Sequence, residues 1–184
     1  MTDKIVIRKA KDEERFVLSA LSMRSKTFWG YSPEFMDSCR AELAISNKDI
    51  ANPNRHYILA ESEGKILGYY ALERISSDEY ELEALFVEPK YIGQGIGRRL
   101  IEHAKYQARR AGARFMLIQG DPNAKGFYCA AGGIQIGERE SDSIPGRYLP
   151  EFRISLKDEK LAHNAYKKTQ QEYLKKPFKD KNRV

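Results

Sequence analysis

The glycine-rich turn that follows an apolar strand is the part of the chain best suited to chemistry. Its sequence, LFVEPKYIGQGIGRRL, leads from a predicted strand into a predicted helix. Gly93, Gly95 and Gly97 lack Cβ atoms, so several backbone amides can turn toward one anion, and the helix adds the positive end of its dipole. Such charge-assisted hydrogen bonds contribute roughly 1.5–3 kcal/mol each. The loop therefore predicts a diphosphate site, with a simple tight turn as the alternative.

Two common nucleotide-binding loops do not fit this turn. A dinucleotide fingerprint that starts at Gly93 or Gly95 needs glycine at position 98 or 100, where the chain has Arg98 and Leu100. A P-loop ends in Gly-Lys-Ser/Thr, whereas Gly97 is followed by two arginines. Nucleoside triphosphate chemistry is therefore disfavoured.

Gly95-Ile96-Gly97 resembles the glycine end of the Gln/Arg-x-x-Gly-x-Gly/Ala motif of the GNAT superfamily of acyl-CoA-dependent N-acetyltransferases. Ile92 stands where the family usually has Gln or Arg, so one side-chain contribution is lost while the backbone contribution is kept. The resemblance runs from about residue 5 to residue 156. It includes LEALFVEP and DPNAKGFYCAAGG, the second similar to the family's Asn-x-x-x-Phe-Tyr segment.

The resemblance implies a mixed α/β fold whose mostly antiparallel central sheet is flanked by helices and splayed between its fourth and fifth strands. It also implies that acetyl-CoA donates an acetyl group to a primary amine, by direct attack in a ternary complex. The alternative from another class is an acyl-CoA-binding sensor or partner-binding module without turnover, for which the Ile92 substitution is the best support.

The strand before the loop changes its pattern in the middle. Glu81 and Glu83 alternate with apolar residues, but residues 84–87 are all apolar, which a bulge or full burial would explain. By resemblance, the pantetheine arm lies in the gap beside this strand and the Phe86 amide faces the thioester carbonyl. The expected acetyl-CoA contacts are Leu85, Phe86, Val87, Ile92, Gly93, Gln94, Gly95, Ile96, Gly97, Arg98, Asn123, Phe127 and Tyr128.

The reaction needs a base, because an alkylammonium with a pKa of about 10.4 is mostly protonated at neutral pH. Glu83 is the first candidate and Glu81 the second; an ordinary solvated strand face is the alternative. Tyr128 falls where the family often has a tyrosine that donates to the CoA sulfur, although it could simply pack its helix on the sheet. Asn123 could cap that helix or bind the pantetheine arm.

The resemblance places acceptor contacts at the junction of the first two helices and in the late loop. The candidates are Arg24, Trp29, Tyr31, Glu81 and Arg147. Arg147 would suit a carboxylate-bearing substrate or pair with a nearby glutamate. The acceptor, a small-molecule or peptide amine, is not identified by these residues.

Hydrophobic periodicity predicts the elements that position these residues. We expect strands at residues 5–10, 80–87, 114–119, 134–137 and 152–156, and a hairpin over 55–74. Helices are expected from Asp12, from Ser32 to about Leu43, from the glycine loop to Gly112, over 124–131, and within the tail.

Composition places these elements in one body. The chain has 184 residues, of which 41% are hydrophobic and 32% charged, which excludes disorder throughout. Its longest stretch without Asp, Glu, Lys or Arg is the 12 residues 126–137, too short for a membrane-spanning helix. The N-terminal segment has no apolar signal region, so we expect a cytoplasmic protein.

The charge is unevenly distributed. Of the net charge of +6, residues 157–184 carry +5, so we divide the chain into an acetyltransferase domain at 1–156 and a basic tail at 157–184. Nucleic-acid binding through this tail is a disfavoured alternative, because the tail offers few aromatic residues for stacking. Packing on a second subunit, as in a homodimer, is the other alternative. The two cysteines, Cys39 and Cys129, lack metal-ligand spacing to the histidines and predict free buried thiols and no metal site.

Overall fold

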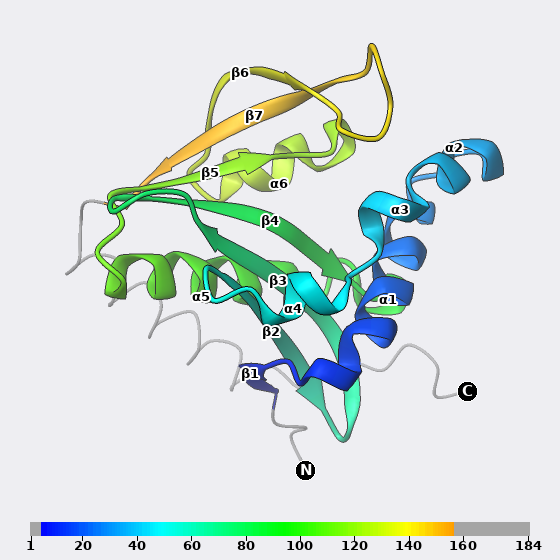
Figure 1. Ribbon diagram of the computed structural model, residues 1–184, viewed down its shortest axis with the longest axis horizontal. Coiled ribbons are helices and arrows are strands. Elements are labelled where there is room, and N and C mark those ends of the chain that lie inside the picture. Colours follow the sequence, from blue (N-terminus) through cyan, green and yellow to red (C-terminus); the bar gives the residue numbers. More distant parts are fainter. Residues whose placement is uncertain (1–4, 157–184) are drawn as a thin grey trace.

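The computed structural model describes residues 5–156, which fold around one seven-stranded sheet (Figure 1). The strand order is β1-β2-β3-β4-β5-β7-β6, and every neighbouring pair is antiparallel except β4 and β5. The strands are β1 Val6–Lys9, β2 Arg55–Ser62, β3 Lys65–Arg74, β4 Glu79–Val87, β5 Phe115–Gln119, β6 Ile134–Glu140 and β7 Tyr148–Ser155. The expected mixed, mostly antiparallel architecture is confirmed.

Helices cover both faces of this sheet. The α-helices are α1 Arg15–Thr27, α2 Pro33–Ser38, α3 Arg40–Leu43, α4 Asn47–Ala51, α5 Ile96–Arg110 and α6 Lys125–Ala130. Short 3-10 turns are η1 Asp12–Glu14, η2 Pro89–Tyr91 and η3 Pro122–Ala124. None of these described helices is both long and apolar enough to cross a membrane.

The two faces have separate apolar cores. The buried stripe of α5, which includes Leu100, Ile101 and Ala104, packs with one set of sheet residues. Leu18 and Leu21 of α1 pack with the alternate residues of β2 and β3 on the other face. Because successive strand residues point to opposite faces, each core takes every second residue of the central strands.

The sheet splays between β4 and β5. These parallel strands pair only at Glu79–Phe115, Tyr80–Met116 and Glu81–Leu117, whereas β4 continues to Val87. Figure 1 shows the two strands meeting at one end and diverging toward the side of the molecule where α1, α2 and α3 lie. Within residues 5–156, one backbone edge of β4 therefore has no neighbouring strand beyond Glu81.

A β-bulge explains the broken alternation in β4. Ala71 pairs with Ala84 and Leu72 with Leu82, so Glu83 is the extra residue that has no partner on β3. The bulge thus lies at Glu83 itself, slightly before the position where the apolar run begins. A bulged residue is aimed differently from its neighbours, and this local change directs the Glu83 side chain.

Several local predictions need correction. Ser32 caps α2 as expected, accepting from the Phe35 amide at 3.2 Å, but the helix breaks at Cys39 into α2 and α3. The first helix is preceded by η1, so Asp12 is not its cap. Helix α4 was not expected, β6 and β7 are longer than predicted, and Cys129 is exposed while Cys39 is buried. The predicted tail helix lies outside the described residues.

Candidate active site

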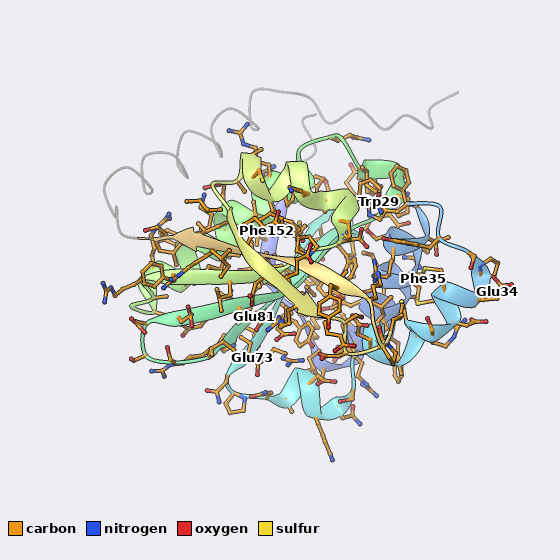
Figure 2. The ribbon with its side chains drawn as sticks, turned by 90° about the horizontal axis from the view of Figure 1, so that it is seen from above. Trp29, Glu34, Phe35, Glu73, Glu81 and Phe152 are labelled. Carbon is orange, nitrogen blue, oxygen red and sulfur yellow. The ribbon has the colours of Figure 1, made fainter. Side chains whose placement is uncertain are left out.

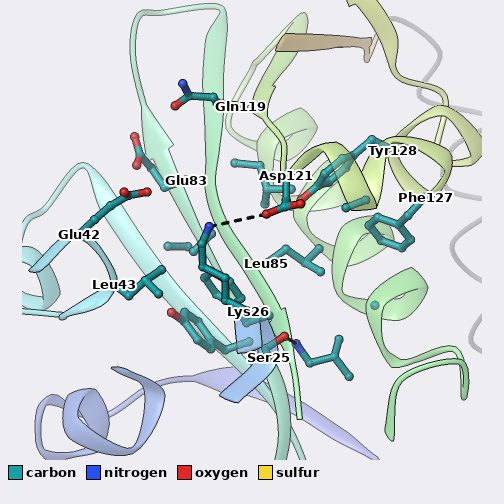
Figure 3. Close-up of a pocket in the computed structure, with 18 of the residues that line it drawn as sticks. Ser25, Lys26, Glu42, Leu43, Glu83, Leu85, Gln119, Asp121, Phe127 and Tyr128 are labelled. Atoms are coloured by element: carbon teal, nitrogen blue, oxygen red, sulfur yellow. Dashed lines mark hydrogen bonds and ion pairs between the residues drawn. The ribbon is translucent and has the colours of Figure 1, made fainter. Parts of the chain in front are cut away.

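A cavity of about 660 Å³ runs from the glycine loop along the free edge of β4 to the bulge (Figure 3). Most of the predicted site residues line it: Trp29, Glu81, Glu83, Leu85, Phe86, Val87, Ile92, Gly93, Gly95, Gly97, Arg98, Asn123, Phe127 and Tyr128. Five predicted residues lie outside this lining: Arg24, Tyr31, Gln94, Ile96 and Arg147. The fold therefore brings distant segments of the chain to one hollow.

The glycine loop forms one end of this cavity. Gly93 and Gly95 adopt left-handed backbone angles, φ 80° and 85°, and α5 begins at Ile96. The amides of residues 92 and 94 bond within the loop, but no described residue accepts from the amides of residue 93 or of residues 95–98. At Gly97 a Cβ would come within 3.3 Å of the Phe127 ring. These free donors at a helix N-terminus fit a diphosphate.

The side chains of the loop contribute less than its backbone. Arg98 is exposed and borders the cavity, where it can reach an anion. Gln94 instead donates to the Lys90 carbonyl at 2.8 Å, and the Ile96 side chain is buried in the core. For Gln94 and Ile96, only the backbone is placed to meet a ligand.

The free edge of β4 supplies a different donor from the one expected. Glu88 donates to the Leu67 carbonyl at 2.9 Å, so the antiparallel alternation directs the Phe86 amide toward β3. The amides of Leu85 and Val87 then face the gap. Val87 donates to Ser25 Oγ at 3.4 Å, whereas no described residue accepts from the Leu85 amide. The expectation that the Phe86 amide faces the thioester is therefore wrong.

Glu83 has the electrostatic environment of a base. Burial raises its pKa to about 7, with further increases from the nearby Glu81 and Glu73 charges and a partial offset from Arg55. The Arg55 guanidinium lies 3.9 Å from the Glu83 carboxylate, too far for a hydrogen bond. A carboxylate with a pKa near neutrality can accept a proton efficiently at physiological pH.

Glu81 is held more firmly than Glu83. It lies opposite Glu73 on β3, and Figure 2 shows these two side chains close together. Each of these two carboxylates pairs with a different arginine: Arg139 binds Glu81, and Arg55 donates to Glu73 at 2.9 Å. Glu81 is also only 8% exposed. Its carboxylate is therefore paired, so of the two candidates Glu83 is the one with the weaker ion pair.

Tyr128 both packs its helix on the sheet and borders the cavity. Its ring packs on Phe152 at 5.6 Å between centroids, and the residue borders the cavity from α6. Burial, followed by the Asp121 charge, raises the pKa of its phenol above the ordinary value. A phenol with a raised pKa remains protonated, so it can donate a hydrogen bond but is a poor source of a full proton.

Asp121 organises the other wall of the cavity. Its carboxylate accepts from the Tyr31 hydroxyl at 2.8 and 2.9 Å and from the backbone and side-chain amides of Asn123 at 2.9 and 3.0 Å. Arg147 lies 3.7 Å and Lys26 3.6 Å away. Asp121 thus caps η3, and Asn123 joins this cluster instead of capping α6. Burial, then Asp121, raises the pKa of Tyr31 to about 12.

The predicted acceptor residues therefore fall into different groups. Trp29 borders the cavity and is 42% exposed. Tyr31 and Arg147 bond to each other at 3.1 Å and support the lining through Asp121, which is the carboxylate that Arg147 pairs with. Arg24 binds Glu88 at 2.7 Å outside the lining, so the structure does not bring it to the cavity.

Sequence reasoning missed Ser25, Lys26, Arg55 and Asp121 as cavity residues. Lys26 and Arg55 belong to an ordinary amphipathic helix and an ordinary strand, which gives no local signal. Asp121 could have been found, because Asp before Pro-Asn at the end of a strand is a typical cap. Within residues 5–156, no group of three or more His, Cys, Asp or Glu side chains is arranged to hold a metal ion.

The splayed sheet, the anion-binding loop and the carboxylate at the bulge define the class of acyltransferases that take a CoA thioester. The chain belongs to the acetyltransferase (GNAT) family, whose family model matches residues 20–132. The resemblance seen in the sequence is thereby confirmed.

Individual relatives agree with this assignment. The chain is 34% identical over 100 residues to the N-alpha-acetyltransferase RimI of Mycobacterium tuberculosis, a match over 52% of this chain and 63% of RimI. It is 29% identical to the 5-NmdU N-acetyltransferase of Pseudomonas phage PaMx11 over 81% of this chain and 98% of that protein. The match to RimI thus spans less than two thirds of that relative's length.

A solved structure shows the same fold. The PaiA N-acetyltransferase of Thermoplasma acidophilum, in complex with coenzyme A, superposes with a TM-score of 0.68 at 20% identity. The alignment covers 83% of this chain and 99% of that one.

Proposed function

We propose that this family member transfers the acetyl group of acetyl-CoA to a primary amine, by direct attack in a ternary complex. The observation that carries the proposal is the continuous cavity that joins the free amides of the glycine loop to Glu83. One end can hold a diphosphate and the other can accept a proton. The family of the chain supports the same reaction.

The chain's own residues fit the acyl donor. Amides from residue 93 and from residues 95–98 would hold its diphosphate, with Arg98 beside them. Leu85, Val87 and Phe127 line the path from this loop to the bulge, and Asn123 borders it. When bound, acetyl-CoA supplies an acyl group activated as a thioester. The glycine loop and the free β4 edge orient that group toward the acceptor end.

Glu83 and Tyr128 act at the reacting end. Glu83 takes the proton of the acceptor amine, which its pKa of about 7 permits near neutral pH. Tyr128 stays protonated and donates a hydrogen bond to the departing sulfur, consistent with the raised pKa of its phenol. Glu81 fixes Arg139 across the sheet and shapes the acceptor end through its like charge.

The acceptor is proposed to be a small-molecule or peptide amine. Relatives named as N-alpha-acetyltransferase and as putative ribosomal protein bS18-alanine N-acetyltransferase support a peptide or protein amine. The proposed contact for it is Trp29, which borders the cavity, and Tyr31 and Arg147 would support the wall it approaches. Three further points stay predictions. Size measurement would test the homodimer, cell fractionation would test the cytoplasmic location, and truncation would test the domain boundary at residue 157.

The decisive experiment is acetyl-CoA binding followed by an amine screen. We expect saturating acetyl-CoA to raise the melting temperature, because a ligand that binds only the folded state stabilises it. Primary amines, including small amines and short peptides, are then screened by release of free thiol. No thermal shift would contradict the proposal. Binding without transfer to any amine would instead favour a sensor without turnover.

A further inference from the structure

Lys26 is a buried ammonium for which the reaction just described has no role. It lies near the end of α1, is 9% exposed, and borders the cavity. Figure 3 shows its amine reaching into the hollow, with Glu83 on one side and Leu85, Asp121 and Tyr128 on the other. Burying a charge is costly unless hydrogen bonds and an opposite charge compensate for it.

The surrounding residues compensate only in part for the cost of burying the Lys26 charge. Its sole ion pair among the described residues is with Asp121, at 3.6 Å, and its side-chain ammonium makes no hydrogen bond to any described group. Asp121 cannot come closer without losing shorter bonds, because Tyr31 and Asn123 already occupy its carboxylate at 2.8–3.0 Å. A carboxylate has only about four acceptor sites. Apart from this ion pair at 3.6 Å, the Lys26 ammonium has no hydrogen-bond acceptor among the described residues.

The local charge is also unbalanced. Arg147 lies 3.7 Å from the same carboxylate, so within residues 5–156 the one charge of Asp121 faces two cations. The rings of Tyr31 and Phe35, at 5.7 and 5.8 Å from the Lys26 amine, add only weak attraction. The two cations beside Asp121 therefore exceed its charge by one, which favours a partner that bears or develops negative charge next to Lys26, while the carboxylates of Glu42 and Glu83 line other parts of the cavity.

A second free donor lies on the neighbouring strand. Ser25, adjacent to Lys26 in sequence, accepts from the Val87 amide at 3.4 Å and so fixes α1 against the free edge of β4. Two residues earlier on the same edge is the Leu85 amide, which faces the gap. A main-chain donor and a cationic donor from two different elements thus line one part of the cavity.

We propose that Lys26 is a further catalytic residue, which donates a hydrogen bond to the carbonyl oxygen of the acyl thioester together with the Leu85 amide. This inference depends on the proposed function. As the amine nitrogen bonds to the carbonyl carbon, the carbonyl electron pair moves onto oxygen, where Lys26 and Leu85 stabilise it. The pair returns as the carbon–sulfur bond breaks, the thiolate leaves with that bond's electrons, and Glu83 holds the proton lost by the amine.

The test uses the vibration of the thioester carbonyl in the bound donor. Acetyl-CoA labelled with carbon-13 at the carbonyl is bound to the full-length wild type and to Lys26→Met, and its carbonyl stretch is isolated by difference infrared spectroscopy. A cationic donor weakens the carbonyl bond, so we expect a lower frequency in the wild type than in Lys26→Met. Lys26→Arg keeps the charge and should restore part of the difference.

A matched control separates this role from a structural one. Lys105 is a similarly buried lysine on α5 that pairs with Glu102 at 2.8 Å and does not border the cavity. Lys105→Met should leave the carbonyl frequency unchanged. We expect calorimetry to show that Lys26→Met weakens acetyl-CoA binding by about 10- to 150-fold, the size of one lost charge-assisted hydrogen bond.

Two results would overturn the inference while leaving the acetyltransferase proposal intact. One is an identical carbonyl frequency in wild type and Lys26→Met, both saturated with acetyl-CoA. The other is an acetyl group on Lys26 itself, detected by mass spectrometry after incubation, since its nitrogen would then be a nucleophile. If the wild type does not bind acetyl-CoA, the proposed function fails and the role of Lys26 fails with it.

Discussion

The two ends of the cavity are built from different materials. At the glycine loop, neighbouring residues of one short segment present their main-chain amides, and side chains matter little. At the bulge, the wall consists of side chains from separate elements: Lys26 of α1, Arg55 of β2, Glu83 of β4 and Asp121 after β5. The first end depends on local backbone shape, whereas the second depends on the assembled fold and its charges.

This difference separates binding from chemistry. Backbone amides cannot change their charge with pH, so the loop end should hold the acyl donor over a broad pH range. Glu83 titrates near neutrality because burial and neighbouring carboxylates disfavour its charged form. We therefore expect substitutions in the loop to act on donor affinity and substitutions at the bulge to act on turnover.

The largest effect is expected from Gly97→Glu. A side chain at this position would meet the Phe127 ring, and its negative charge would stand among the free amides. Losing two or more charge-assisted bonds would raise the Kd for acetyl-CoA by more than about 100-fold. Calorimetry measures this directly, and the thermal shift with acetyl-CoA should disappear.

Gly126→Glu is the matched control for this substitution. Gly126 is the second residue of α6, as Gly97 is of α5, and a Cβ there meets nothing within 4 Å. It should bind acetyl-CoA as the wild type does. Equal loss in both variants would show that the loop amides are not the donor site.

A smaller effect, and on turnover alone, is expected from Glu83→Gln. Removing a general base should lower kcat about 10²–10⁴-fold, with donor affinity unchanged. In the wild type, kcat/KM should rise with pH through a midpoint of about 7, as the carboxyl loses its proton. The variant should lose this limb, while Glu138→Gln, on the exposed strand β6, should keep it. A pH profile unaltered by Glu83→Gln would assign the base elsewhere.

The smallest effect is on stability and depends on pH. Because the fold raises the pKa of Glu83, its contribution to stability is full at low pH and is lost as pH rises through about 7. The glutamine of Glu83→Gln stays neutral, so the melting temperature of this variant should exceed that of the wild type at about pH 8.5 but not at about pH 4.5. A difference of about 1 kcal/mol in the free energy of unfolding corresponds to about 2–4 °C. The Glu83 side chain is 32% exposed, which limits the gain. A difference in melting temperature that does not change with pH would argue against a buried, destabilised charge on Glu83.

How much could be predicted from the sequence follows the same division. The glycine loop, α5 and the hairpin can each be predicted from residues that are neighbours in sequence, and all three are found where expected. The broken alternation of β4 indicated a bulge, but only the register with β3 identifies Glu83 as the bulged residue. The orientation of the Phe86 amide likewise depends on the ladder and could not be read from one strand.

The charged end was the harder part to predict because its contacts are long-range. Asp121 and Tyr31 are 90 residues apart in the chain, and Arg147 reaches both. Nothing near Lys26 in sequence indicates that it enters a cavity, since lysine in the last turn of a helix is common and favourable. Such assignments need the packed structure.

The short junction of β4 and β5 has a mechanical consequence. Strands β1–β4 and strands β5–β7 each form their own antiparallel ladders, and three residue pairs join the two groups. A molecule bound in the gap between β4 and β5, with hydrogen bonds to both strands, would hold the two groups of strands together. Amide hydrogen exchange along the facing edges of β4 and β5 should then slow when such a molecule is bound, while exchange in the outer strand β1 should be unchanged.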